Sequence, residues 1–171
     1  MQINRIWSMP NKNTFSISPI KSLLQKYIKE NDFWIDPFAN TSSFCTVTND
    51  LNNNYNCDFS LNATKFLKLF KNNCADGVLF DPPYSPRQIK ECYDSIGLKV
   101  SQQDTQSKFW SDCKDEISRI IKPNGVVISF GWNSNGIGKS RGFKIEEILI
   151  VPHGGNHNDT ICTVERFIGN F

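Results

Sequence analysis

The sequence has few of the residues that bind metals or build disulfide frameworks. It contains six cysteines and two histidines, and no two cysteines form a C-x-x-C pair or cluster with a histidine. His153 and His157 have the spacing of metal ligands, but no acid and thiol set accompanies them. This pattern fits neither a zinc site nor a disulfide framework. We therefore expect no metal site, and reduced cysteines that mostly pack in the interior.

Long apolar runs and a large excess of charge are also absent. No segment approaches the roughly 18 apolar residues of a membrane span, and nothing resembles a signal peptide. We expect a soluble protein that stays inside the cell and has no membrane partner. The formal net charge of +2 is far from the strongly basic surface that would by itself indicate a nucleic-acid-binding protein.

The composition that is present is typical of a globular protein, with 39% hydrophobic and 21% charged residues. A chain of 171 residues has the size of one domain and can bury roughly two thirds of the surface that it exposes when unfolded. There is no internal repeat and no segment with the composition of a linker. We therefore expect residues 1–171 to form a single domain with one core.

Apolar periodicity predicts strands that alternate with helices. Short apolar runs bounded by turn residues predict strands at 33–36, 44–48, 77–80, 126–130, 143–151 and 160–167. Apolar residues at helical spacing predict helices at 18–31, 62–70, 85–96 and 109–121. The start of the chain is expected to be irregular, and residues 97–108, which have no clear period, to form a mobile loop.

Three helix boundaries carry specific signals. Ser18 is a candidate N-cap, because a proline follows it at the first helical position. Ser85 and Gln88 have the spacing of a capping box at the start of the third helix. The sequence Lys-Pro-Asn-Gly at 122–125 is expected to end the fourth helix.

This alternation predicts an α/β protein with a Rossmann-like layout. Its sheet should be open and mostly parallel, with helices on both faces and an antiparallel hairpin at the C-terminal end. The turn-rich connection at 152–159 joins the two strands of that hairpin. In such sheets ligands bind at the carboxyl ends of the strands, and the sequence Asp-Pro-Pro-Tyr at 81–84 follows one of them.

The chemistry of these four residues suits an exocyclic amine on a nucleobase. Asp81 and the carbonyl of Pro82 can each accept one amine hydrogen. Pro82 and Pro83 have no N–H group and a fixed φ, so the turn cannot pair with a neighbouring strand. The ring of Tyr84 can stack on a base that is single-stranded or flipped out of a duplex. The alternative is an ordinary exit from a strand, with Tyr84 as a packing residue.

Together with Asp-Pro-Phe-Ala-Asn at 36–40, this motif resembles the S-adenosylmethionine-dependent amino-methyltransferases of DNA, which modify N6 of adenine or N4 of cytosine. The resemblance spans nearly the whole chain, although some RNA enzymes share the motif. It implies a Rossmann-like methyltransferase fold, S-adenosylmethionine as the cofactor, and a single catalytic domain. The catalytic residues that it implies are Asp81, Pro82, Pro83 and Tyr84.

The resemblance also implies a cofactor site. Asp36, Pro37, Phe38 and Ala39 correspond to the motif that lines the methionine half, with Phe15 and Ile17 packing on the methionine end. Asp50 corresponds to the acid that bonds the ribose hydroxyls, and Asn62 to a residue near the adenine. The alternatives are that Asp36 begins a turn, Asp50 caps a loop and Asn62 is a helix N-cap. The family's glycines after Asp-Pro-Phe are missing here.

Four further residues are candidates for contact with nucleic acid. They are Arg87, Trp132, Lys139 and Arg141. Solvated surface charge is the alternative for the three cations, and closure of the core for Trp132. The segment 133–140 ends like a phosphate-binding loop, but residue 133 is Asn133 where that motif needs glycine, so we reject this reading.

The function expected from the sequence is methylation of a base amine, most simply N6 of adenine in DNA. The chain resembles short enzymes of phages, without room for a separate target-recognition region. It should therefore have little or short sequence specificity, or obtain specificity from a partner or a second subunit, as in a homodimer. The expected location is the cytoplasm of a bacterium or a phage-infected cell. Alternatives are an RNA base-amine methyltransferase, acting on adenine or guanine, and a non-catalytic nucleic-acid-binding or regulatory subunit.

Overall fold

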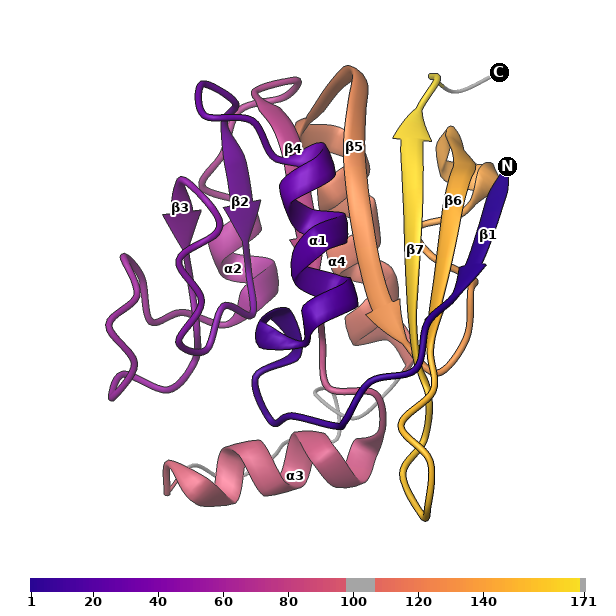
Figure 1. The fold of residues 1–171 in the computed structure, drawn as a ribbon. Helices are drawn as coiled ribbons and strands as arrows, with labels where there is room; N and C mark the ends of the chain where they lie inside the picture. Colours follow the sequence, from indigo (N-terminus) through magenta and orange to yellow (C-terminus); the bar gives the residue numbers. More distant parts are fainter. Residues whose placement is uncertain (98–106, 170–171) are drawn as a thin grey trace.

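The structure, a computed structural model, describes residues 1–97 and 107–169. One seven-stranded sheet has the order β1-β6-β7-β5-β4-β2-β3, and every neighbouring pair is parallel except the two that involve β7 (Figure 1). The strands are β1 (Gln2–Arg5), β2 (Trp34–Asp36), β3 (Val47–Thr48), β4 (Ala75–Phe80), β5 (Ile121–Gly131), β6 (Phe143–Val151) and β7 (Thr160–Phe167). The predicted Rossmann-like sheet with a C-terminal antiparallel hairpin is confirmed.

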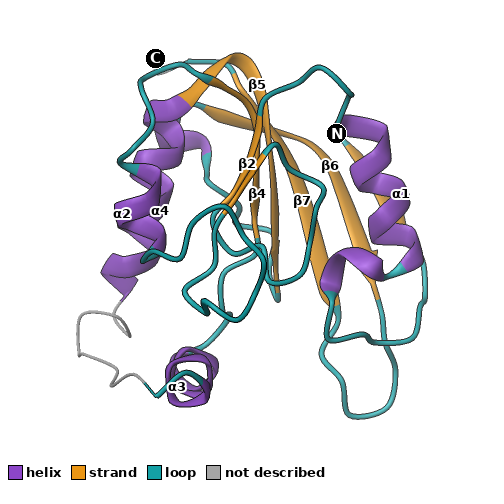
Figure 2. Cartoon of the chain, turned by 90° about the vertical axis from the view of Figure 1, so that its left-hand side faces the viewer, coloured by secondary structure: helices purple, strands orange, loops and turns teal. Residues whose placement is uncertain are grey.

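Helices cover both faces of the sheet. Figure 2 shows α1 (Ser18–Tyr27) on one side, and α2 (Ala63–Leu67) and α4 (Ser107–Ile120) on the other. Two apolar clusters fill the two interfaces, one around Leu24 and Ile128 and one around Phe66 and Ile117. The remaining α-helix, α3 (Pro86–Ser95), lies across the end of the sheet (Figure 1). No helix in the described part of the chain is long and apolar enough to cross a membrane.

The strand order creates a switch point between β2 and β4. From β2 the chain first adds β3 on one side, and then returns to add β4 on the other side. The connections therefore diverge above the carboxyl ends of β2 and β4, which leaves a crevice suited to a ligand. Asp36 ends β2 and Phe80 ends β4, so both predicted motifs begin at this crevice.

Packing between these two strands depends on a glycine. Gly77 pairs with Trp34 across the strands, and a Cβ on Gly77 would lie 2.3 Å from Cε2 of the Trp34 indole. The indole is almost completely buried, with an exposed fraction of 1%. It has no free space to move into, so only glycine fits at this position.

We expect Gly77→Ala to lower the free energy of unfolding by about 1–3 kcal/mol, because the added methyl group overpacks the core. Urea denaturation of the variant measures this loss. Gly131→Ala is the matched control, since the nearest atom to its added Cβ is 3.9 Å away. Equal stability of the two variants would contradict this account of the β2–β4 contact.

The sequence-based boundaries need four corrections. The start of the chain is not irregular, because β1 pairs in parallel with β6. Ser18 is the first residue of α1 and not its N-cap; Ile17 occupies the cap position, without a side-chain bond. Residues 122–125 lie inside β5, which begins directly after α4. The strand expected at 44–48 is reduced to β3. The mobile loop expected at 97–108 lies mostly outside the described residues.

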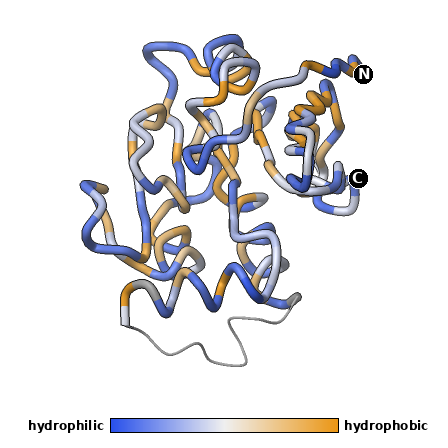
Figure 3. Tube along the Cα trace, turned by 60° about the horizontal axis from the view of Figure 1, so that its bottom comes forward, coloured by the Kyte–Doolittle hydropathy of each residue, from blue (hydrophilic) through white to orange (hydrophobic). Residues whose placement is uncertain are grey.

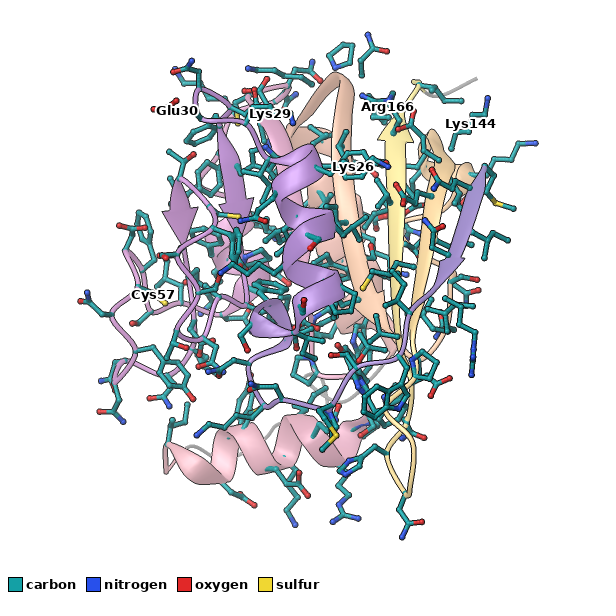
Figure 4. The ribbon with its side chains drawn as sticks, viewed as in Figure 1. Lys26, Lys29, Glu30, Cys57, Lys144 and Arg166 are labelled. Atoms are coloured by element: carbon teal, nitrogen blue, oxygen red, sulfur yellow. The ribbon has the colours of Figure 1, made fainter. Side chains whose placement is uncertain are left out.

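A buried carboxylate holds α1 and β1 on the sheet at the end opposite α3. Glu147 on β6 accepts hydrogen bonds from Lys26 Nζ at 2.6 Å and Tyr27 Oη at 2.7 Å, and from Asn4 Nδ2 at 3.0 Å. Lys26 and Arg166 lie at this end in Figure 4, and Arg166 pairs with Glu146 at 2.6 Å. These cations are therefore engaged in structural ion pairs.

Candidate active site

The turn at 81–84 is held from both sides. Ser85 is the N-cap of α3 and accepts a bond from the backbone N–H of Gln88, as the capping pattern predicted. The Gln88 side chain in turn accepts the Tyr84 backbone N–H at 2.6 Å. Trp110 on α4 donates its indole N–H to the Pro83 carbonyl at 3.1 Å. Among the described residues no donor bonds the Pro82 carbonyl, so this oxygen can accept from a ligand.

Asp81 and Tyr84 form a hydrogen-bonded pair. The Tyr84 hydroxyl donates to Asp81 Oδ1 at 2.5 Å. Burial raises the pKa of Asp81 to about 6, and hydrogen bonds from Tyr84 and Thr14 limit that increase. Burial and the neighbouring carboxylate likewise raise the pKa of Tyr84. The Tyr84 hydroxyl therefore stays protonated and occupies Asp81 Oδ1, and a carboxylate has further lone pairs with which it can accept from a ligand.

The turn after β2 contains an unsatisfied acceptor. Asp36 is completely buried, and its Oδ1 accepts the Phe38 backbone N–H at 3.0 Å. In the described part of the chain its Oδ2 has no partner. Burial, with Asp81 and Asp50 nearby, raises its pKa well above the ordinary value. A buried oxygen without a partner is costly, and the raised pKa limits that cost, because burial penalises the charged form most.

Asn40 adopts the conformation that a glycine would supply. Its φ is +50°, in the left-handed region that asparagine tolerates better than most residues. The Asp50 carboxylate stabilises this conformation by accepting the Asn40 backbone N–H at 3.0 Å. The backbone bend after Asp-Pro-Phe is thus present although the glycines are missing.

Asn49, which the sequence analysis missed, ties this turn to the rest of the sheet. It is completely buried, and its Nδ2 donates to the carbonyls of Pro37 at 3.0 Å and Leu61 at 2.9 Å. Its backbone carbonyl accepts the Ala39 N–H at 2.8 Å. An asparagine in a polar stretch gives no sequence signal for such burial, which only the approach of three loops creates.

One cavity of about 850 Å³ joins the two turns. The predicted site residues that line it are Phe15, Pro37, Phe38, Ala39, Asp50, Asn62, Asp81, Pro82, Pro83 and Tyr84. Asn62 is also the N-cap of α2, as its alternative reading expected. Asp36 and Ile17 do not line the cavity; both are buried. Residues of α3, among them Ile89 and Ile96, form a further wall. In Figure 3 this helix, which leads into the grey trace, alternates hydrophobic and hydrophilic segments.

The four predicted nucleic-acid contacts do not gather at one place. Trp132 is 44% exposed, and its ring meets Tyr84 edge-on with centroids 5.6 Å apart. Arg87 is exposed on α3 and pairs with Glu91. Lys139 and Arg141 precede β6, at the opposite end of the sheet from Asp81. Arg141 is engaged there by Asp115 at 2.6 Å.

A buried carboxylate occupies the segment that resembled a phosphate-binding loop. Glu165 on β7 accepts the backbone N–H groups of Ile137 at 2.5 Å and Gly138 at 3.0 Å. A Cβ on Gly136, whose φ is +54°, would lie 2.2 Å from this carboxylate. The glycines therefore serve an internal anion, which confirms the rejection of a phosphate-binding loop.

Within the residues that the structure describes, no group of three or more histidine, cysteine or acidic side chains could hold a metal ion. His153 is instead buried and fixed by hydrogen bonds to the Ser8 carbonyl at 2.9 Å and the Thr160 hydroxyl at 2.8 Å. It links the N-terminal segment to the hairpin of β6 and β7. Its role in this part of the fold is structural.

Comparisons with known proteins identify the fold. No protein-family model matches the sequence, and no curated protein sequence matches it. Among solved structures, TrmN from Thermus thermophilus superposes with a TM-score of 0.58 at 13% identity, over 88% of this chain and 49% of TrmN. This chain thus spans about half the length of TrmN.

Two further structures match over more of their own length. The 1,6-didemethyltoxoflavin-N1-methyltransferase of Burkholderia thailandensis, solved with S-adenosylhomocysteine, has a TM-score of 0.59 at 10% identity, covering 88% of this chain and 77% of that protein. A methyltransferase from Methanosarcina mazei has a TM-score of 0.55 at 10% identity, over 84% of this chain and 96% of that protein. The chain therefore has the Rossmann-like fold of S-adenosylmethionine-dependent methyltransferases.

Proposed function

We propose that this protein is an S-adenosylmethionine-dependent methyltransferase that modifies an exocyclic base amine, N6 of adenine in DNA. The observation that carries the proposal is the shared cavity, which is lined both by Asp81 and Pro82 and by the turn that follows β2. The motif and the crevice thus occur together at the place where this fold class binds ligands.

The residues around the turn after β2 fit the cofactor. Pro37, Phe38 and Ala39 line the cavity where its methionine half would bind, and Asp50 lines it where ribose hydroxyls would bind. Asn40 restores the bend that the missing glycines would have given. These features favour a catalytic protein over the alternative of a subunit that has lost cofactor binding.

The cofactor would supply an electrophilic methyl group on sulfur. The contribution of this chain is to hold the acceptor amine: the Asp81 carboxylate and the Pro82 carbonyl each accept one of its hydrogens, which increases electron density on the nitrogen. The carboxylate can then take up the proton that the methylated amine loses. Tyr84, with Trp132 against it, borders the space for the base.

The raised pKa of Asp81 predicts an acid limit on activity. The carboxylate form accepts the amine hydrogen, and below a pKa of about 6 the protonated form increasingly replaces it. We expect kcat/KM to fall about tenfold per pH unit below pH 6 and to level off above pH 7. A pH–rate profile with saturating cofactor measures this fall. A profile in which kcat/KM falls only near pH 4 would contradict the buried environment assigned to Asp81.

Transfer of a labelled methyl group distinguishes the substrates. The purified protein is incubated with labelled cofactor and either single-stranded DNA, duplex DNA or RNA of matched length. Label in either DNA supports the proposal, and label in RNA alone would establish the RNA alternative. Calorimetry with S-adenosylmethionine separates both outcomes from a protein that does not bind the cofactor.

A further inference from the structure

The first nine residues expose an unusual amount of apolar surface. Met1, Ile3, Trp7 and Met9 have exposed fractions of 78%, 58%, 59% and 66%. Met1 and Ile3 lie at the start of the outer edge strand β1, which pairs with β6 on one side only (Figure 1), and Trp7 and Met9 follow this strand. Ile6, at an even position, is also 50% exposed. Soluble proteins rarely leave a contiguous apolar edge of this kind unprotected.

The backbone of this edge is also available for pairing. Ile6 and Ser8 donate their N–H groups to the carbonyls of Ile150 and Pro152. The main-chain groups of these even-numbered residues therefore point toward β6 and the segment that follows it. By the alternation of a parallel ladder, the N–H and C=O groups of Ile3, Arg5 and Trp7 point away from the sheet. One edge therefore presents both main-chain partners and exposed apolar side chains.

The sequence along this edge is nearly palindromic. The odd positions read Met1, Ile3, Arg5, Trp7 and Met9, with apolar residues placed symmetrically about the arginine. In an antiparallel pairing centred on Arg5, Ile3 lies opposite Trp7 of a second copy, and Met1 opposite Met9. The same register pairs the outward N–H and C=O groups of Ile3 with those of Trp7.

We propose that β1 pairs with β1 of a second copy of this chain, which forms a symmetric dimer with one continuous fourteen-stranded sheet. The pairing buries apolar side chains and main-chain groups of the same segment on both protomers. A two-fold interface requires a surface that is complementary to itself in this way. Stable interfaces bury roughly 800 Å² per partner, so the pairing must cover the four exposed apolar side chains together with the strand edge.

The dimer has a geometric consequence for the active site. β1 runs parallel to β6, β5 and β4 within one protomer, so an antiparallel β1–β1 pair reverses the direction of the second sheet. The carboxyl ends of β4, and with them the two cavities, then lie at opposite ends of the assembly. Each protomer would act on its own substrate molecule.

Sedimentation of the full chain, from micromolar to hundreds of micromolar, tests the proposal. We expect the native protein to form a dimer, and Trp7→Asp to be monomeric while its far-UV circular dichroism spectrum stays native. Because association stabilises the native state, only the native protein should melt at a temperature that rises with concentration. Ile168→Asp, which alters an apolar side chain that is 44% exposed elsewhere, should leave the dimer intact. A native monomer at every concentration, or a dimer that Trp7→Asp leaves intact, would overturn the proposal.

The register has its own test. Arg5 faces Arg5 of the second copy, and directly opposed like charges weaken a strand pair. In an equal mixture of native protein and Arg5→Glu, native mass spectrometry should show more heterodimer than the half that random pairing gives. Random proportions would rule out the register centred on Arg5. Neither test depends on methylation, so failure here leaves the proposed activity untouched.

Discussion

Asp81→Ala is expected to reduce methyl transfer by at least about 100- to 1,000-fold, the usual cost of removing one group that stabilises developing charge. The variant loses the acceptor for one amine hydrogen, while the residues around the turn after β2 remain. Its affinity for S-adenosylmethionine should therefore stay within a few fold of the native value. Initial rates with saturating cofactor, together with calorimetry, measure the two quantities.

Asp81→Asn separates catalysis from folding in the same experiment. The asparagine oxygen can still accept the Tyr84 hydroxyl, but its side chain never carries the charge. Because the pKa of Asp81 in the folded protein lies above its ordinary value of 3.8, ionisation opposes folding, and the opposition is complete above about pH 6. We expect Asp81→Asn to be inactive and to melt at a higher temperature than the native protein at pH 8. Full activity in either variant would remove Asp81 from the chemistry.

Asp50→Ala is expected to weaken S-adenosylmethionine binding by about 10- to 100-fold, the equivalent of roughly 1.5–3 kcal/mol for hydrogen bonds to a charged group. Asp50 lines the cavity, and its carboxylate also accepts the backbone N–H groups of Asn40 at 3.0 Å and Asn52 at 2.9 Å. Its removal takes away a ribose partner and loosens the left-handed residue of the loop. Calorimetry gives the dissociation constant.

Asp58→Ala is the matched control for this loss. Asp58 also accepts bonds from backbone and hydroxyl, both on Thr48 at 2.8 Å, but it does not line the cavity. Its removal should leave the dissociation constant within about twofold, with some loss of stability, since a single hydrogen bond contributes about 1 kcal/mol. Equal weakening by both substitutions would mean that loop order, and not the contact made by Asp50, determines affinity.

The strands that the sequence predicted best are those whose apolar pattern is long. β6 and β7 begin and end where expected, because β6 is an apolar-rich run between Gly142 and Pro152, and β7 begins directly after the turn-rich segment 152–159. β1 was missed because Gln2–Arg5 has one apolar residue in four. Its extended form depends on the exposed edge of β6, which no local pattern reveals.

Boundaries went wrong where tertiary contacts override local preference. Residues 122–125 read as a helix stop, yet β5 already begins at Ile121, because Ile121 pairs with Ala75 and the Ile120 carbonyl accepts the Cys74 N–H at 2.8 Å. A bulge then absorbs the turn-forming residues before the regular pairing at Gly77.

The candidate site was predictable in its motif and not in its supports. Asp81 and Tyr84 lie at the carboxyl end of β4 as the four-residue motif predicts, and the turn proposed to hold the cofactor follows β2. Thr14, Asn49 and Trp110 were missed, although they fix or tune these residues. Each contacts the site across a gap of many residues in the chain, so its role follows from topology and not from any spacing in the sequence.

Nucleoside mass spectrometry of treated DNA tests the central proposal most directly. Unmethylated DNA is incubated with the full chain and S-adenosylmethionine that carries a deuterated methyl group, then digested and analysed, with Asp81→Asn as the control. The account predicts deuterated N6-methyladenine with the native protein and none with the variant. Cofactor binding without any deuterated nucleoside, from DNA or from RNA treated in the same way, would contradict it.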